Sequence, residues 1–365
     1  MQQAGALLNG STNADRTNYW EVVPTRAIDR ALWMESDRMG FLLPALTRQR
    51  FETQRDVVLN ERRQSYENRP YGMVMMALSA ALYPPDHPYS WMTIGSADDI
   101  RAMQLEDVQD FFRTYYHPAN ASLVLAGDVE TERAFDLAEA YFGEIPGGVR
   151  PQRISNSAEL SSQRRLVLED RVELPRLYQA WHSPAMFTAG DAEMDLLGDL
   201  LANGKTSRLY KTLVYDLRIA LDVSAYQSSR EIASFFLLVA TAAPGHTLTE
   251  IANRIDEELL RVMDEGPTGE EMERAVAQAE SHFMYRLQTV GGFGGKSDQL
   301  NAYNVLKGNP GFFAADLDRY RSATQASLQA VGRAHLLLDR RIVLSVIPRG
   351  QHALALEGSA AVSVS

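Results

Sequence analysis

The chain has 365 residues, a length that favours two domains, each able to bury a hydrophobic core of ordinary size. Hydrophobic residues make up 45% of the sequence and charged residues 23%, proportions typical of folded globular proteins and unlike those of disordered or membrane chains. The net charge of −11 argues against a nucleic-acid partner, no apolar run is long enough for a membrane span, and the absence of cysteine from the sequence excludes disulfides and thiolate metal sites.

The first predicted element is a strand over residues 17–23, a segment rich in aromatic and β-branched side chains. A helix is predicted over residues 50–67, and it ends before Pro70. In this helix Glu61 follows Val57 by four residues and Val58 by three, so the spacing places its carboxylate on or beside the apolar stripe. A carboxylate there needs a metal or a cationic partner, and the alternative to a metal is pairing with an arginine.

Residues 105–125 predict an amphipathic helix followed by a strand. Residues 144–163 are rich in Pro, Gly, Ser and Asn and predict an interdomain linker, which places the boundary near residue 155. We therefore expect an N-terminal domain over residues 1–155 and a C-terminal domain over residues 156–365. Within the second domain, residues 164–170 and 176–182 are predicted to form a pair of strands.

The two halves of the chain resemble each other. Residues 325–345 repeat the helix-then-strand order of residues 105–125 at an offset of 220, and residues 233–239 match residues 17–23 at an offset of 216. Similar offsets at both ends of a half indicate a tandem duplication, although chance similarity between amphipathic segments is the alternative. In the second half the 68 residues 165–232 precede the matched strand, and in the first half only 16 residues do, so we expect the first domain to be truncated at its N-terminus.

Strands at each end of a half, with helices between them, predict the fold class: an α+β protein of two duplicated domains, the first incomplete. Each domain is expected to be a mainly antiparallel sheet with helices packed on one face.

Six segments, in this order and spacing, resemble the pitrilysin/insulinase (M16) zinc metallopeptidase family, which includes the mitochondrial processing peptidases and bacterial half-size members. The likeness covers nearly the whole chain, and the segments are residues 5–24, 51–61, 87–100, 115–129, 198–216 and 291–310. The family fold agrees with the α+β prediction.

The resemblance implies a zinc site. The family binds Zn²⁺ through an inverted H-x-x-E-H helix, which also holds the general base, and through a downstream Glu. Glu61 matches that downstream ligand, and Gln54 stands where the family often has a second-shell Glu. The seven histidines never stand three or four residues apart, so we expect the motif to belong to a missing segment. The sequence then holds no catalytic residue, and zinc binding by this chain is expected to be weak or absent.

The resemblance also implies how substrate binds. Asn9, Gly10, Ser11 and Thr12 match an edge strand to which an extended peptide substrate adds as a further strand, and a purely structural edge strand is the alternative. The glycine-rich residues 290–297 lack the glycine spacing and the preceding strand of a phosphate-binding loop. They predict a flexible loop between helices, and a substrate contact there is one possibility that the resemblance suggests.

In the second half the family has an Arg and a Tyr that grip the substrate, and Val214 and Leu221 occupy these positions. Neither side chain donates a hydrogen bond. The resemblance therefore implies a heterodimer with a paralogue that supplies the Arg/Tyr pair.

The predicted function is a zinc-dependent endopeptidase, or the truncated remainder of one, inactive as this chain alone. The alternative is a non-catalytic scaffold subunit that supports an active paralogue. The cellular location is not determined by the sequence, and only the resemblance favours the bacterial periplasm.

Overall fold

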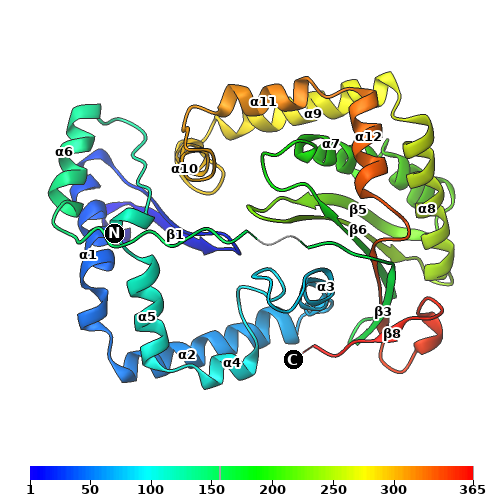
Figure 1. Cartoon of the computed structure of the whole chain (residues 1–365), viewed down its shortest axis with the longest axis horizontal. Helices are drawn as coiled ribbons and strands as arrows, with labels where there is room; N and C mark the ends of the chain where they lie inside the picture. The colour runs from blue at the N-terminus through cyan, green and yellow to red at the C-terminus, as the bar shows by residue number, and fades with distance from the viewer. Residues whose placement is uncertain (156–157, 365) are drawn as a thin grey trace. The chain divides into compact units, whose positions relative to one another are not determined.

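The computed structural model describes residues 1–155 and 158–364, and these form two compact units (Figure 1). Unit 1 consists of Met1–Asn60, Ala97–Ile154 and Ser281–Ala315, and unit 2 consists of Glu61–Ser96, Ser155–Glu280 and Asp316–Ser365. Each unit therefore combines segments from both halves of the chain. The predicted boundary near residue 155 assumed contiguous domains, and it stays a prediction.

Unit 1 is mainly helical among the described residues, with one two-stranded antiparallel sheet. Its strands are β1 (Leu7–Thr12) and β2 (Thr17–Val22). Its helices are α1 (Ile28–Ala45), α2 (Arg48–Arg62), α4 (Ala97–Ala102), α5 (Leu105–Tyr115), α6 (Thr131–Phe142) and α10 (Lys296–Lys307), with 3₁₀ turns at Gln2–Ala4, Thr25–Ala27 and Pro118–Asn120. The last two residues of α2 fall in unit 2 by sequence range. Helices α9 (Gly269–Arg286) and α11 (Phe313–Arg321) likewise contribute residues to both units.

Unit 2 is built on a six-stranded mixed sheet in the order β5-β6-β4-β7-β3-β8. The strands are β3 (Arg164–Asp170), β4 (Arg176–Ser183), β5 (Ala220–Ser228), β6 (Ser234–Ala242), β7 (Ile342–Pro348) and β8 (Ala360–Ala361). The pairs from β5 to β7 are antiparallel, and β3 is parallel to both β7 and β8. The predicted pairing of residues 164–170 with residues 176–182 is wrong, because β7 lies between these two strands.

Helices cover both faces of this sheet. On one face α7 (Asp191–Ala202), α8 (Leu248–Glu265) and α12 (Gln325–His335) enclose a core that includes Trp181 and Leu238. On the other face α3 (Val74–Leu82) packs against Tyr178 and Leu344 (Figure 1). Short helical turns at Arg63–Glu67, Tyr210–Asp216 and His352–Leu354 complete the unit. The predicted α+β class is confirmed, and α3 brings residues of the first half onto the second-half sheet.

The repeated segments agree in part. The predicted helices are α5 and α12, and the matched strands are β2 and β6, each antiparallel to the strand before it. The strand predicted to follow α5 does not form, because residues 121–126 pair with no strand among the described residues. Its counterpart β7 pairs on both sides. Accordingly, Leu123 is 47% exposed and its match Val343 is 1% exposed.

Among the described residues, no helix has both the length and the apolar content needed to cross a lipid bilayer.

Candidate functional site

The four predicted peptide-contacting residues, Asn9 to Thr12, lie in β1, which pairs only with β2 among the described strands. Ser11 donates through both its backbone N–H and its hydroxyl to the Asn18 side-chain oxygen of β2, at 3.1 and 2.6 Å. Backbone groups of an antiparallel strand point alternately to its two edges. The N–H of Gly10 therefore points to the outer edge, where the Asn9 side chain accepts it at 2.8 Å.

Gly10 is required by close packing within the hairpin. A Cβ at this position would lie 3.1 Å from the Asn18 backbone oxygen and 3.1 Å from the ring of Tyr19, its partner in β2. The absence of a side chain at Gly10 therefore lets the Tyr19 ring pack closely against β1.

The glycine-rich loop between α9 and α10 lies against the other strand of this hairpin. Phe293 contacts the Trp20 ring edge-on at 5.5 Å, and a Cβ on Gly291 would come within 2.6 Å of Val22. The Asn18 amide donates to Asp298 at 3.1 Å, and Asp298 in turn accepts the N–H of Gly294 at 2.8 Å. One hydrogen-bonded chain thus connects β1, β2 and the start of α10.

The same loop has little capacity to hold a phosphate through its backbone. The N–H groups of Gly295, Lys296 and Ser297 donate to carbonyls within the loop, at 2.9–3.2 Å, and that of Gly294 is bonded to Asp298. A phosphate-binding loop presents such N–H groups to its ligand. The structure therefore agrees with the rejection of a phosphate-binding loop.

A polar cluster beneath the hairpin was not predicted from the sequence. The hydroxyls of Tyr19 and Tyr116 are hydrogen-bonded at 3.0 Å, and the Arg38 guanidinium lies 3.9 Å from the centre of the Tyr19 ring and pairs with Glu35. Burial and the Glu35 carboxyl raise the pKa of Glu21 to about 8, against the opposing effect of Arg38. The one available signal was the three-residue spacing of Glu35 and Arg38 on α1.

The predicted metal ligand Glu61 lies near the end of α2, in unit 2, and its side chain is exposed. The expectation that its carboxylate lies on or beside an apolar stripe, away from the solvated face, is wrong, because the Glu61 side chain is exposed and Val57 is 49% exposed. The neighbouring Arg62 is the buried residue, and it pairs with Glu67 and donates to the Gly95 carbonyl at 3.0 Å. Gln54 is also exposed and belongs to unit 1.

The residues present do not complete a zinc site. Within residues 1–155 and 158–364, no three His, Asp or Glu side chains are grouped so that they could hold a metal ion. Three protein ligands are usual for catalytic zinc, so Glu61 alone does not fit the complete metal centre of the family. Its role as one ligand stays a prediction.

In the second half, the two positions at which the family has the substrate-gripping Arg and Tyr carry apolar side chains. Val214 packs against the core of unit 2, and Leu221, in β5, is 53% exposed. Neither position offers a donor to a substrate carbonyl.

Comparison with known families and proteins identifies relatives of this chain. Residues 102–279 match the family described as "Peptidase M16 inactive domain". The zinc protease PqqE of Helicobacter pylori is 26% identical over 316 residues, which are 84% of this chain and 70% of that protein. The beta subunit of the mitochondrial-processing peptidase of Caenorhabditis elegans is 26% identical over 148 residues, 40% of this chain and 31% of that subunit.

Solved structures give the same fold. The crystal structure of a protease from Helicobacter pylori superposes with a TM-score of 0.85 at 23% identity, covering 95% of this chain and 83% of that one.

Proposed function

Since the chain belongs to the M16 peptidase family, we propose that it binds extended peptides along β1 as part of a zinc-dependent endopeptidase. The observation that supports this most directly is the exposed outer edge of β1. A strand edge with unpaired backbone groups accepts another chain by strand addition, with little demand on the side chains of the added peptide.

The geometry of β1 supports binding through alternate residues. Since the backbone N–H of Gly10 points to the outer edge of β1, the backbone N–H groups of Leu8 and Thr12 point the same way. The Asn9 side chain holds the Gly10 N–H at 2.8 Å, so an incoming peptide carbonyl would replace the Asn9 oxygen there. The hydrogen bonds from Ser11 to Asn18 on the inner edge would keep β1 in register while the peptide binds.

Leu8→Pro tests this proposal. Proline removes the outward N–H at a solvent-facing edge position, where strands tolerate it. We expect peptide affinity to fall about 3-fold to 10-fold, the range for one lost hydrogen bond of roughly 1 kcal/mol with some steric cost. Fluorescence anisotropy with a labelled extended peptide measures it, without any need for catalysis.

Leu8→Ala is the matched control, because it removes the same side chain and keeps the N–H. It should bind the peptide almost as the parent does. Equal loss in both variants would assign the contact to the leucine side chain, and no loss in either would remove β1 from the binding surface.

The catalytic part of the proposal needs more than the described residues. Zinc, when bound in this family, supplies an activated water for peptide hydrolysis. We propose Glu61 as one ligand, with the other ligands and the general base provided from outside the described residues. Val214 and Leu221 support a second proposal, that a paralogous subunit provides the Arg and Tyr that grip the substrate.

A non-catalytic scaffold subunit is the competing function. It is supported by the match of residues 102–279 to a domain described as "Peptidase M16 inactive domain" and by the fact that the described residues hold no three-ligand cluster. As a scaffold, the chain would bind a paralogue and peptide without holding zinc.

The two functions differ in their response to Glu61→Gln. In the protein that contains this sequence, purified together with its paralogue, the enzyme proposal expects cleavage that a zinc chelator abolishes. Because Glu61 is exposed, the substitution should preserve the fold and lower zinc affinity by about a hundredfold or more, beyond the cost of losing an outer-shell partner. Zinc content and cleavage of a quenched fluorescent peptide are the measurements.

Glu52→Gln, at another exposed position of α2, is the control and should leave both measurements unchanged. Zinc content and cleavage that survive Glu61→Gln would exclude Glu61 as a ligand. Absence of any chelator-sensitive cleavage in the complete assembly would favour the scaffold.

A further inference from the structure

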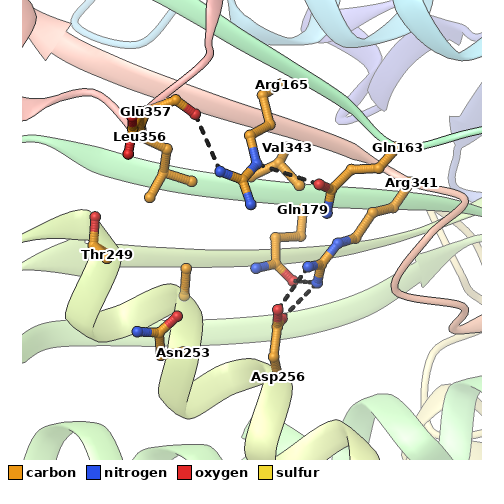
Figure 2. Close-up of a pocket in the computed structure, with 11 residues that line it drawn as sticks. Gln163, Arg165, Gln179, Thr249, Asn253, Asp256, Arg341, Val343, Leu356 and Glu357 are labelled. Atoms are coloured by element: carbon orange, nitrogen blue, oxygen red, sulfur yellow. Dashed lines mark hydrogen bonds and ion pairs between the residues drawn. The ribbon is translucent and has the colours of Figure 1, made fainter.

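Unit 2 contains a cavity of about 180 Å³ between its sheet and α8, remote in sequence from Glu61 and from β1 (Figure 2). Its floor crosses three neighbouring strands, because the register aligns Gln179 of β4, Val343 of β7 and Arg165 of β3 in one row. Helix α8 covers the row with residues spaced three and four apart, including Asn253 and Asp256. The cavity is therefore a regular product of sheet register and helical periodicity.

The floor carries polar groups that are buried and only partly satisfied. Gln179 is fully buried and Arg341 is 4% exposed. Arg341 donates to the Gln179 side-chain oxygen at 3.0 Å and to both carboxylate oxygens of Asp256, at 2.5 and 2.7 Å. Because arginine only donates, these bonds fix the Gln179 amide with its oxygen toward Arg341.

The opposite end of that amide is consequently directed into the cavity. Figure 2 shows the Gln179 nitrogen turned away from Arg341. Neither this nitrogen nor Nε of Arg341 has a hydrogen-bond partner among the described residues. Both residues line the cavity, and because buried donors of this kind are normally satisfied, the Gln179 nitrogen directed into the cavity indicates an acceptor that occupies it.

A positive charge at the rim favours an anionic acceptor. Arg165 donates to the Gln163 side chain at 3.2 Å and to the Glu357 carbonyl at 3.1 Å, and within the described part of the chain no carboxylate forms an ion pair with it. The charge of Arg341, in contrast, is compensated by Asp256. Asn253, at an exposed rim position, adds a further amide.

We propose that this cavity binds a small carboxylate. Its oxygens would accept from Gln179, Arg341 and Arg165, and the apolar side chains of Val343 and Leu356 would contact its carbon atoms. A cavity of ~150 Å³ is known to hold benzene, so a cavity of about 180 Å³ suits a ligand of about six heavy atoms. A planar carboxylate matches the donor geometry of a guanidinium better than a spherical anion does.

Lactate, with six heavy atoms, is the probe, and its neutral analogue lactamide is the paired ligand control. We expect saturable binding of lactate by calorimetry or ligand-observed NMR, and at least about tenfold weaker binding of lactamide. A second pair, the dipeptide Ala-Ala and its C-terminal amide, distinguishes a free small acid from the end of a peptide. Binding of Ala-Ala but not of lactate would assign the site to peptide C-termini, which share the carboxylate.

Arg165→Gln should weaken lactate binding about tenfold or more, while the fold is retained because the residue lies on the exposed rim. Arg164→Gln is the matched control, since it removes the same charge from the adjacent position, whose side chain is on the other face of the sheet and donates to the Ala81 carbonyl at 3.0 Å. It should leave binding unchanged.

If lactate binding weakened equally in both variants, the loss would be due to the change in net charge, and the proposed site would be wrong. Failure of lactate, Ala-Ala and inorganic phosphate alike to bind would mean that water alone satisfies the buried donors. Binding of phosphate without either carboxylate would overturn the planar-anion assignment.

Discussion

At the scale of single residues, unit 2 places a partly buried acid, Asp195, where its protonation is coupled to folding. Asp195 on α7 accepts the Tyr320 hydroxyl at 2.6 Å and lies beside Asp191, whose charge is compensated by Arg319 at 2.5 Å. Burial raises the pKa of Asp195 to about 7, the Tyr320 hydrogen bond opposes the shift, and the Asp191 charge adds to it. The folded protein therefore holds a proton there more tightly than the unfolded chain, for which the ordinary pKa is 3.8.

The sign of the pH dependence follows from this difference. Between pH ~4 and ~7 the folded state binds more protons, so the contribution of Asp195 to stability is greatest at low pH and is lost as the pH rises through about 7. Asp195→Asn should remove that loss. We expect the unfolding free energy of the parent, relative to the variant, to fall by up to about 1.4 kcal/mol per pH unit in this window.

Urea denaturation at several pH values measures the difference. Asp264→Asn, at an exposed position of α8, is the control and should follow the parent. Parallel pH profiles for the parent and Asp195→Asn would contradict the raised pKa.

At the scale of elements, the sequence predicted whether a segment forms a helix or a strand better than it predicted which strands pair. The helices α5 and α12 follow from an amphipathic pattern that is local, and both form over the same eleven positions of their repeats. The strands expected after them are equally apolar, yet only β7 forms, because a strand requires a neighbour and the pattern carries no information about one. Leu123 and Val343, matched in sequence, therefore differ in exposure.

The candidate site shows the same limit. The strand at residues 9–12 was expected only from the family resemblance, because Asn, Gly, Ser and Thr show no apolar alternation of their own. The exposure of Glu61 was not predictable, because a helical stripe is buried only where another element packs against it, and at Val57 none does. The cluster of Tyr19, Glu21 and Arg38 was missed because its members come from a strand and a helix with no shared motif.

At the scale of the whole molecule, the two compact units are each assembled from both halves of the chain. Residues 61–96 contribute α3, which covers one face of the second-half sheet, and Leu78 on this helix is fully buried. The second-half sheet thus depends for stability on a helix of the first half.

Leu78→Ala tests that dependence. Removing a fully buried leucine should cost about 2–5 kcal/mol of unfolding free energy. We expect hydrogen exchange to accelerate in β4 and β7, the strands that α3 contacts. Val57→Ala, at a half-exposed position of α2, is the control. It should change the unfolding free energy by no more than about 0.5 kcal/mol and leave hydrogen exchange in β4 and β7 unchanged. Unchanged exchange in the sheet of Leu78→Ala would show that α3 is dispensable there.

The position of β7 between β3 and β4 has a consequence for biosynthesis. Its two neighbours leave the ribosome about 160 residues before it does, so throughout that interval the nascent chain carries two strands whose facing edges have no mate. Such edges recruit strands from other chains. The sheet can close on itself only after Ile342–Pro348 has been synthesised, and a chaperone that shields these edges until then would keep them from pairing with other chains.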